Sequence, residues 1–186
     1  MLQKDSMDED LRNRLWNVTS AFLVKIGDTG RYVDDTPPNL LAIVRPLWHR
    51  FLGSPFDTIP HDRRESYKHL RKYFFECHWN EVYDFIELFA TSLQDYDRHQ
   101  VFITSCNHVL EREVSAYRFV GVQIADLTSA EEIESIEQAM DLSGPLKPVS
   151  AHLGQALKLL ADRKAPDYRN SIKESISAVE SVCKLL

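Results

Sequence analysis

Apolar residues recur at helical spacing along most of this chain, and the clearest case is its last part, residues 149–186. This part is predicted to form two amphipathic helices joined by a short charged turn. In the second helix the apolar residues follow one another in steps of four and three, which places them on one face. They are Tyr168, Ile172, Ile176, Val179, Cys183 and Leu186. Neither a capping Gly nor a Pro follows this stripe, so we expect it to pack against more protein, either a continuation or a partner.

The same periodicity predicts helices over most of the preceding sequence. A capping box of Ser6 and Glu9 predicts the start of the first, and Gly27 its end. Further helices are expected at about 40–52, 62–76 (capped by Asp62), 79–93 and 97–115. In the second of these, Pro46 lacks an amide hydrogen and should either kink the helix or mark a late start. The residues expected to face the core include Leu11, Leu15, Phe22, Val44, Leu70, Phe74, Phe85, Phe89 and Phe102.

A different pattern begins at Tyr117, where YRFVGVQIADLT is rich in β-branched and aromatic residues. It predicts a small β-hairpin at about Tyr117–Leu127 that turns at Val120–Gly121 and brings Phe119 close to Ile124. A short helix follows, capped by Thr128 with Glu131 or by Ser129 with Glu132.

The predicted fold class is therefore mainly α, a multi-helix bundle on which one small hairpin lies, because an isolated hairpin is not stable alone. The segment SGPLKP is the best candidate for a domain boundary. It divides the chain into a helical domain with a hairpin at 1–143 and a closing helical pair at 149–186.

Charge and cysteine content limit the classes of function. The formal net charge of −6 disfavours non-specific binding of nucleic acid over the whole surface, although it permits a local basic site. Cys77, Cys106 and Cys183 are too few and too far apart for a disulfide framework, which is typical of a reducing compartment. The first residues, MLQKDSMDEDLRNRL, include acidic residues where a secretory leader would have a positive region and then an apolar run, and no apolar run approaches membrane-spanning length. We expect a cytoplasmic protein that does not enter a membrane.

One local basic patch stands out within residues 61–72, formed by Arg63, Arg64, Lys68, Arg71 and Lys72. Such a patch contacts RNA phosphate or an acidic protein surface, or else it is simply the solvated face of an amphipathic helix, which is the commoner case. Within it, Arg64 and His69 match the loose Arg-x4-6-His pattern of HEPN ribonucleases, in which His is a general base and Arg holds phosphate charge. On an ideal helix these two side chains point well apart.

Other chemistry has little support in the sequence. Cys and His residues lack the turn-like spacing of four convergent zinc ligands, so we expect no metal site. No phosphate-binding glycine motif and no nucleophile with an identifiable base is present, and we expect no cofactor.

Several segments together resemble the AbiJ-type abortive-infection family of bacteria. They are DEDLRNRLWNV, HWNEVYDFIELFA, CNHVLEREVSAYRFVGVQIADLTSAEEIESIEQAM and LADRKAPDYRNSIKESISAVESVCKLL, in the order of the family. The resemblance implies an N-terminal helical region followed by a HEPN-like helical domain, with a role in defence against phage. It also implies that residues 149–186 are the opening helices of an incomplete HEPN-like bundle.

The resemblance departs from the family pattern at the ribonuclease motif. Arg169 and Asn170 are similar to its start, but Glu174, Ser175 and Ile176 occupy the positions at which His should stand. Whether the chain is an enzyme stays open, and the sequence favours a non-catalytic sensor, regulatory or interaction module. It would bind a protein partner, or itself, through Ile172, Ile176, Val179, Cys183 and Leu186. The alternatives are a metal-independent ribonuclease using Arg64 and His69, and a plain helical scaffold.

Overall fold

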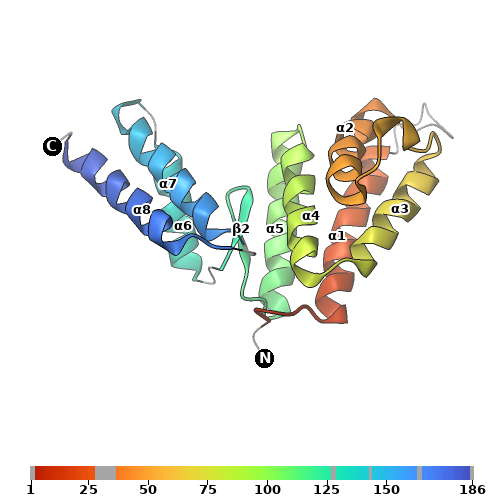
Figure 1. Cartoon of the computed structure of the whole chain (residues 1–186), viewed down its shortest axis with the longest axis horizontal. Helices are drawn as coiled ribbons and strands as arrows, with labels where there is room; N and C mark the ends of the chain where they lie inside the picture. The colour runs from red at the N-terminus through yellow and green to blue at the C-terminus, as the bar shows by residue number, and fades with distance from the viewer. Residues whose placement is uncertain (1–2, 28–36, 127–128, 143, 163–164, 185–186) are drawn as a thin grey trace. The chain divides into compact units, whose positions relative to one another are not determined.

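A computed structural model describes residues 3–27, 37–126, 129–142, 144–162 and 165–184 (Figure 1). The chain divides into two compact units, Gln3–Val114 and Ser115–Leu186, which are described separately as the N-terminal and C-terminal units. Helices make up most of the described chain, and its two strands form one antiparallel pair. The predicted fold class, mainly α with one small hairpin, is confirmed.

The N-terminal unit consists of helices. They are α1 (Glu9–Gly27), α2 (Pro38–Leu47) with a π-helical turn η1 (Trp48–Leu52), a 3-10 turn η2 (Phe56–Thr58), α3 (Arg63–Glu76), α4 (Trp79–Ser92) and α5 (Tyr96–Arg112). Figure 1 shows α1, α4 and α5 running side by side, while α2 and α3 also pack on α1. This arrangement places the start of α3 beside the end of α1, where Arg63 donates to the carbonyl of Gly27.

Aromatic side chains fill the core of this unit. Phe74, Phe85, Phe89 and Phe102 are fully buried, as their place on the predicted apolar stripes required. Trp16, which lies on the inner face of α1, packs against Tyr67 and Phe74 of α3 with ring centroids 5.4 and 5.1 Å apart. Aromatic pairs at these distances add to the stability gained from burial alone.

The cap of α3 is the predicted one, whereas the cap of α1 differs from the prediction. Asp62 caps α3 as predicted, accepting a 2.8 Å hydrogen bond from the amide of Arg64. In α1 the predicted cap Ser6 is wrong, because Asp8 accepts from the amide of Leu11 at 2.8 Å. Gln3 holds Asp8 in place by donating to its carboxylate and accepting from its amide.

Pro46 does not delay the start of its helix. It lies inside α2, whose first residue is Pro38. After Leu47 the helix continues as the π-helical turn Trp48–Leu52. The missing amide hydrogen of a proline removes one intrahelical bond, and π-helical turns occur where the regular ladder is interrupted.

The C-terminal unit is built around the hairpin of β1 (Arg118–Val120) and β2 (Gln123–Ala125). Phe119 pairs with Ile124, as predicted, but Val120 pairs with Gln123. The turn is therefore Gly121–Val122, one residue later than expected, and Gly121 takes a positive φ of 57°. Its amide donates to Glu137 of α6 at 2.9 Å. The predicted end of the hairpin at Leu127 lies outside the described residues.

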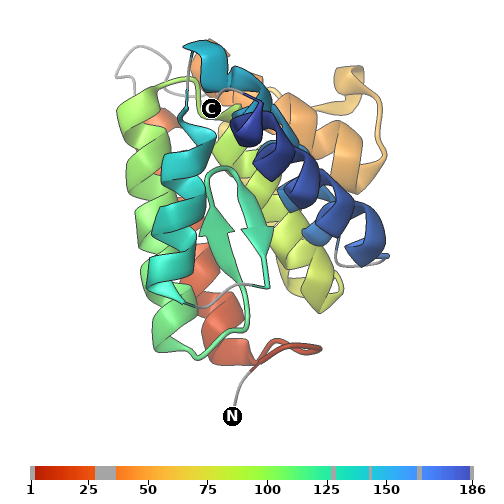
Figure 2. The same ribbon diagram turned by 90° about the vertical axis from the view of Figure 1, so that its left-hand side faces the viewer.

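Helices α6 (Ala130–Met140) and α7 (Lys147–Leu160) contact the hairpin through β1 and β2 respectively (Figure 2). Ser129 caps α6 and accepts a hydrogen bond from the amide of Glu132, as the second of the two predicted alternatives required. Thr128, the other predicted cap, lies outside the described residues. The 3-10 turn η3 (Gly144–Leu146) falls within the predicted boundary segment. Val120, Ala125 and Leu157 form a small core, on which Ile133, Ile136 and Met140 pack.

The last helix, α8 (Tyr168–Cys183), packs against α7. The contact is made by small side chains, since Ser171 and Ala178 are the buried residues of α8. Ser171 donates to the carbonyl of Ala156 at 2.9 Å, and His152 of α7 pairs with Glu174 at 2.7 Å. Asp167 caps the helix through the amide of Asn170.

Candidate functional site

The large apolar side chains of α8 lie outside its contact with α7. Tyr168, Ile172, Ile176 and Val179 are 59, 61, 55 and 63% exposed, and Cys183 is also exposed. We call these five residues the α8 stripe. Leu186, the sixth residue of the predicted docking set, lies outside the described residues. A helix normally turns its large apolar residues inward. Here the small residues face α7 and the large ones face solvent.

The basic patch is divided between two surroundings. Arg63, Arg64 and Lys68 line a cavity between α1, α2 and α3, whereas Arg71 lies over the ring of Phe75 with its guanidinium carbon 4.7 Å from the centroid. Lys72 is exposed. Of the five residues of the basic patch, only those in the first two turns of α3 therefore line a cavity.

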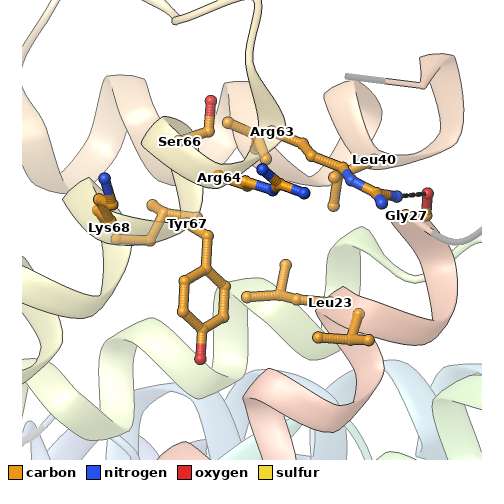
Figure 3. A pocket seen from close by; sticks show the side chains of 11 residues that line it. Leu23, Gly27, Leu40, Arg63, Arg64, Ser66, Tyr67 and Lys68 are labelled. Carbon is orange, nitrogen blue, oxygen red and sulfur yellow. Dashed lines mark hydrogen bonds between the residues drawn. The ribbon is translucent and has the colours of Figure 1, made fainter. Parts of the chain in front are cut away.

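The cavity has a volume of about 500 Å³ and an apolar floor (Figure 3). Leu23, Leu40 and Val44 are at most 5% exposed and form much of this floor. Arg63 spans the cavity and donates to the carbonyl of Gly27 at 2.5 Å, and Figure 3 shows the guanidinium of Arg64 beside it. The ammonium of Lys68 turns away to Glu65, 2.6 Å distant, so its contribution to the cavity is the aliphatic stem.

The structure does not bring Arg64 and His69 into one site. Arg64 lines the cavity, whereas the ring of His69 packs against Trp48 of η1 with centroids 5.4 Å apart. Nδ1 of His69 lies 2.8 Å from the carbonyl oxygen of Glu65. A carbonyl only accepts, so Nδ1 is the donor in this contact.

Two of the three cysteines are in surroundings that suppress thiolate chemistry. Burial raises the pKa of Cys77 to about 11 and raises the pKa of Cys106 well above its usual range. Thiols with raised pKa values are poor nucleophiles and poor metal ligands at neutral pH. Within the described part of the chain, no three His, Cys, Asp or Glu side chains gather in a way that could hold a metal ion.

Sequence reasoning missed the cavity, although it singled out the basic patch. The apolar floor comes from α1 and α2, and only the tertiary packing places it beside the cations of α3. The sequence did contain one signal, because Val24 is apolar but does not belong to the apolar stripe of α1. In the structure Val24 is 63% exposed and lines the cavity.

The family model of the AbiJ N-terminal domain 4 matches residues 1–142 of this chain. The chain belongs to this AbiJ family. The match covers all of the N-terminal unit, the hairpin and α6, and it identifies an abortive-infection protein that acts in phage defence. No curated protein and no solved structure matches the chain.

The AbiJ match and the compactness of the structure divide the chain differently. The match ends at residue 142, whereas the two compact units meet between Val114 and Ser115. Helices α7 and α8 lie beyond the match, so the HEPN-like character of residues 149–186 and the domain boundary after 143 stay predictions. Among the described residues, none of the helices combines the length and the apolar character that crossing a membrane requires.

Proposed function

We propose that this AbiJ-family chain is a non-catalytic regulatory module that docks an amphipathic helical surface on the α8 stripe, a second copy of the chain being the partner. The observation that carries the proposal is the exposure of Ile172, Ile176 and Val179, each more than half accessible to solvent. Contiguous apolar patches on a protein surface mark interaction sites.

The spacing of the α8 stripe supports a helical partner. Successive members are four, four, three and four residues apart, close to the alternating steps by which one helix inserts side chains between those of another. The contact between α7 and α8 already occupies the small-residue face through Ser171 and Ala178. Docking on the stripe would therefore leave the helical pair intact, and two copies would bury the same surface on each side.

Adding charge to the stripe should abolish this association. The double variant Ile176→Glu/Val179→Glu places two carboxylates where apolar contacts are proposed, and unpaired buried charge is strongly unfavourable. We expect light scattering to show a mass that rises with concentration towards a dimer for the wild type, and a monomer for the variant. Lys173→Glu, at an exposed position of α8 outside the stripe, is the control, because it makes the same change in net charge and should still associate. A wild type that stays monomeric at high concentration contradicts the proposal.

Alkylation of Cys183 gives a second measure of the same interface. This thiol is exposed on the stripe, whereas Cys106 is buried and Cys77 is half-buried. Iodoacetamide should label Cys183 fastest, and its labelling rate should fall as the protein concentration rises. A rate that does not change with concentration, at concentrations where the protein is dimeric, would place the dimer contact elsewhere.

A metal-independent ribonuclease that uses Arg64 and His69 is the alternative, motivated by the match of these two residues to the Arg-x4-6-His pattern within the basic patch. The different surroundings of the two side chains argue against it. A phosphate held by Arg64 would lie in the cavity, whereas His69 packs against Trp48. We expect the wild type to leave single-stranded RNA intact in EDTA. Cleavage that is lost in both His69→Ala and Arg64→Ala would replace the non-catalytic proposal.

A further inference from the structure

We propose that the cavity between α1, α2 and α3 binds an organic phosphate of nucleotide size, with the phosphate at Arg64 and Arg63 and the base on the apolar floor. The cavity volume of about 500 Å³ lies within the range of small-molecule sites. A site of this kind combines a mainly apolar lining with a few polar groups that fix the orientation of the ligand.

Charge at the cavity favours an anion. The eleven described residues that line it include the guanidinium groups of Arg63 and Arg64 and no carboxylate, while the ammonium of Lys68 is already paired with Glu65. The guanidinium of Arg64 has no hydrogen-bond or ion-pair partner among the described residues, so its donors are available to a ligand. Arg63 donates to Gly27 through one nitrogen and keeps others. This positive surface stands out on a chain whose formal net charge is −6.

The position of the two arginines on α3 points the same way. Both lie in its first turn, where the helix dipole already supplies positive charge and where acidic residues are normally favoured. Asp62 and Glu65 compensate in part, but Asp62 caps the amide of Arg64, and Glu65 is paired with Lys68. A bound phosphate would relieve the remaining repulsion, and guanidinium groups match phosphate through paired hydrogen bonds.

The floor of the cavity suits the base and not a second charge. Leu23, Leu40 and Val44 present aliphatic surface, and the ring of Tyr67 extends along one side towards Leu23 (Figure 3). Val24 lines the same cavity while 63% exposed, so a ligand there would cover apolar surface that is now in water. The flat faces of a nucleobase fit such a floor, whereas a sugar phosphate without a base would leave it wet.

This site shares no residue with the α8 stripe and lies within the N-terminal unit, so it stands or falls independently of the proposed docking function. The probes are AMP, GMP, CMP and UMP, titrated into the full chain by calorimetry at low and high salt. We expect saturable binding of at least one of them, and weaker binding of inorganic phosphate and adenosine, which each carry half of the recognised chemistry.

Matched variants on α3 separate the cavity from the surface charge of the helix. Arg64→Gln and Lys72→Gln each remove one positive charge from an exposed position, but only Arg64 lines the cavity. We expect Arg64→Gln to weaken nucleotide binding about tenfold or more, and Lys72→Gln to change it less than about twofold. Val24→Glu, which adds a carboxylate at the cavity, should weaken binding to a similar extent as Arg64→Gln.

Two results would overturn the inference. The first is the absence of saturable binding for all four nucleotides, and saturation by laurate in that case would make the site one for a fatty carboxylate. The second is an equal loss in Arg64→Gln and Lys72→Gln, which would show attraction to the whole basic helix and not to the cavity.

Discussion

Replacing Phe102 by Ala is expected to lower the free energy of unfolding of the N-terminal unit by about 3–5 kcal/mol. The Phe102 side chain of α5 is fully buried, and its ring lies between those of Phe22 and Phe89, with centroid distances of 5.2 and 4.8 Å. Truncation removes apolar contact with α1 and α4 at once and leaves a cavity that the surrounding helices fill only in part. A loss of this size is a large share of the net stability of a typical domain.

Urea unfolding followed by tryptophan fluorescence measures this effect in the right unit. The three tryptophans of the chain, Trp16, Trp48 and Trp79, all lie in the N-terminal unit, so the signal reports its unfolding. Val101→Ala is the matched control, because Val101 is the neighbouring residue on α5 but is 57% exposed, and we expect a change within about 0.5 kcal/mol. Equal losses in the two variants would contradict the assigned core.

The apolar periodicity was sufficient to place helices and to identify much of the core. The predicted ranges for α3 and α4 agree closely with Arg63–Glu76 and Trp79–Ser92, because strong stripes are bounded there by Asp62 and by a turn. The start of α1 was misplaced, since the choice of Asp8 as its cap depends on Gln3, and the amide of Gln3 is held by the carbonyl of Val114. A contact between residues so far apart in the sequence is not visible in a local pattern.

For the candidate sites too, the sequence pattern predicted the local features but not those that depend on contacts between helices. The stripe from Ile172 to Val179 follows from spacing alone, but the sequence did not show that Ser171 and Ala178 would make the inner face of α8. The basic patch was also visible, yet its division between a cavity and an exposed surface depends on α1 and α2. Arg63 reaches the end of α1 to bond Gly27, and that contact encloses one side of the cavity.

Replacing Arg12 by Met should cost about 2–3 kcal/mol of unfolding free energy, because it removes the donor that satisfies the end of α3. Nη1 of Arg12 lies 3.0, 3.1 and 2.9 Å from the carbonyl oxygens of Phe74, Phe75 and Cys77. The last carbonyls of a helix have no intrahelical partner, and a positive charge there also interacts favourably with the negative end of the helix dipole. Methionine keeps the apolar stem of the side chain but donates no hydrogen bond, so the change isolates the guanidinium.

The same urea titration measures this loss, and amide exchange localises it. We expect exchange to quicken most in the last turn of α3, near Phe75 and Cys77, and least in α5, since a weakened cap frays the helix end before the bundle opens. Arg50→Met is the control, because it makes the same exchange of side chains at an exposed position of η1 and should change stability within about 0.5 kcal/mol. If the Arg12 and Arg50 variants are equally stable, the contact of Arg12 with α3 does not hold the two helices together. In that case the burial of Trp16 between α1 and α3 must account for their packing.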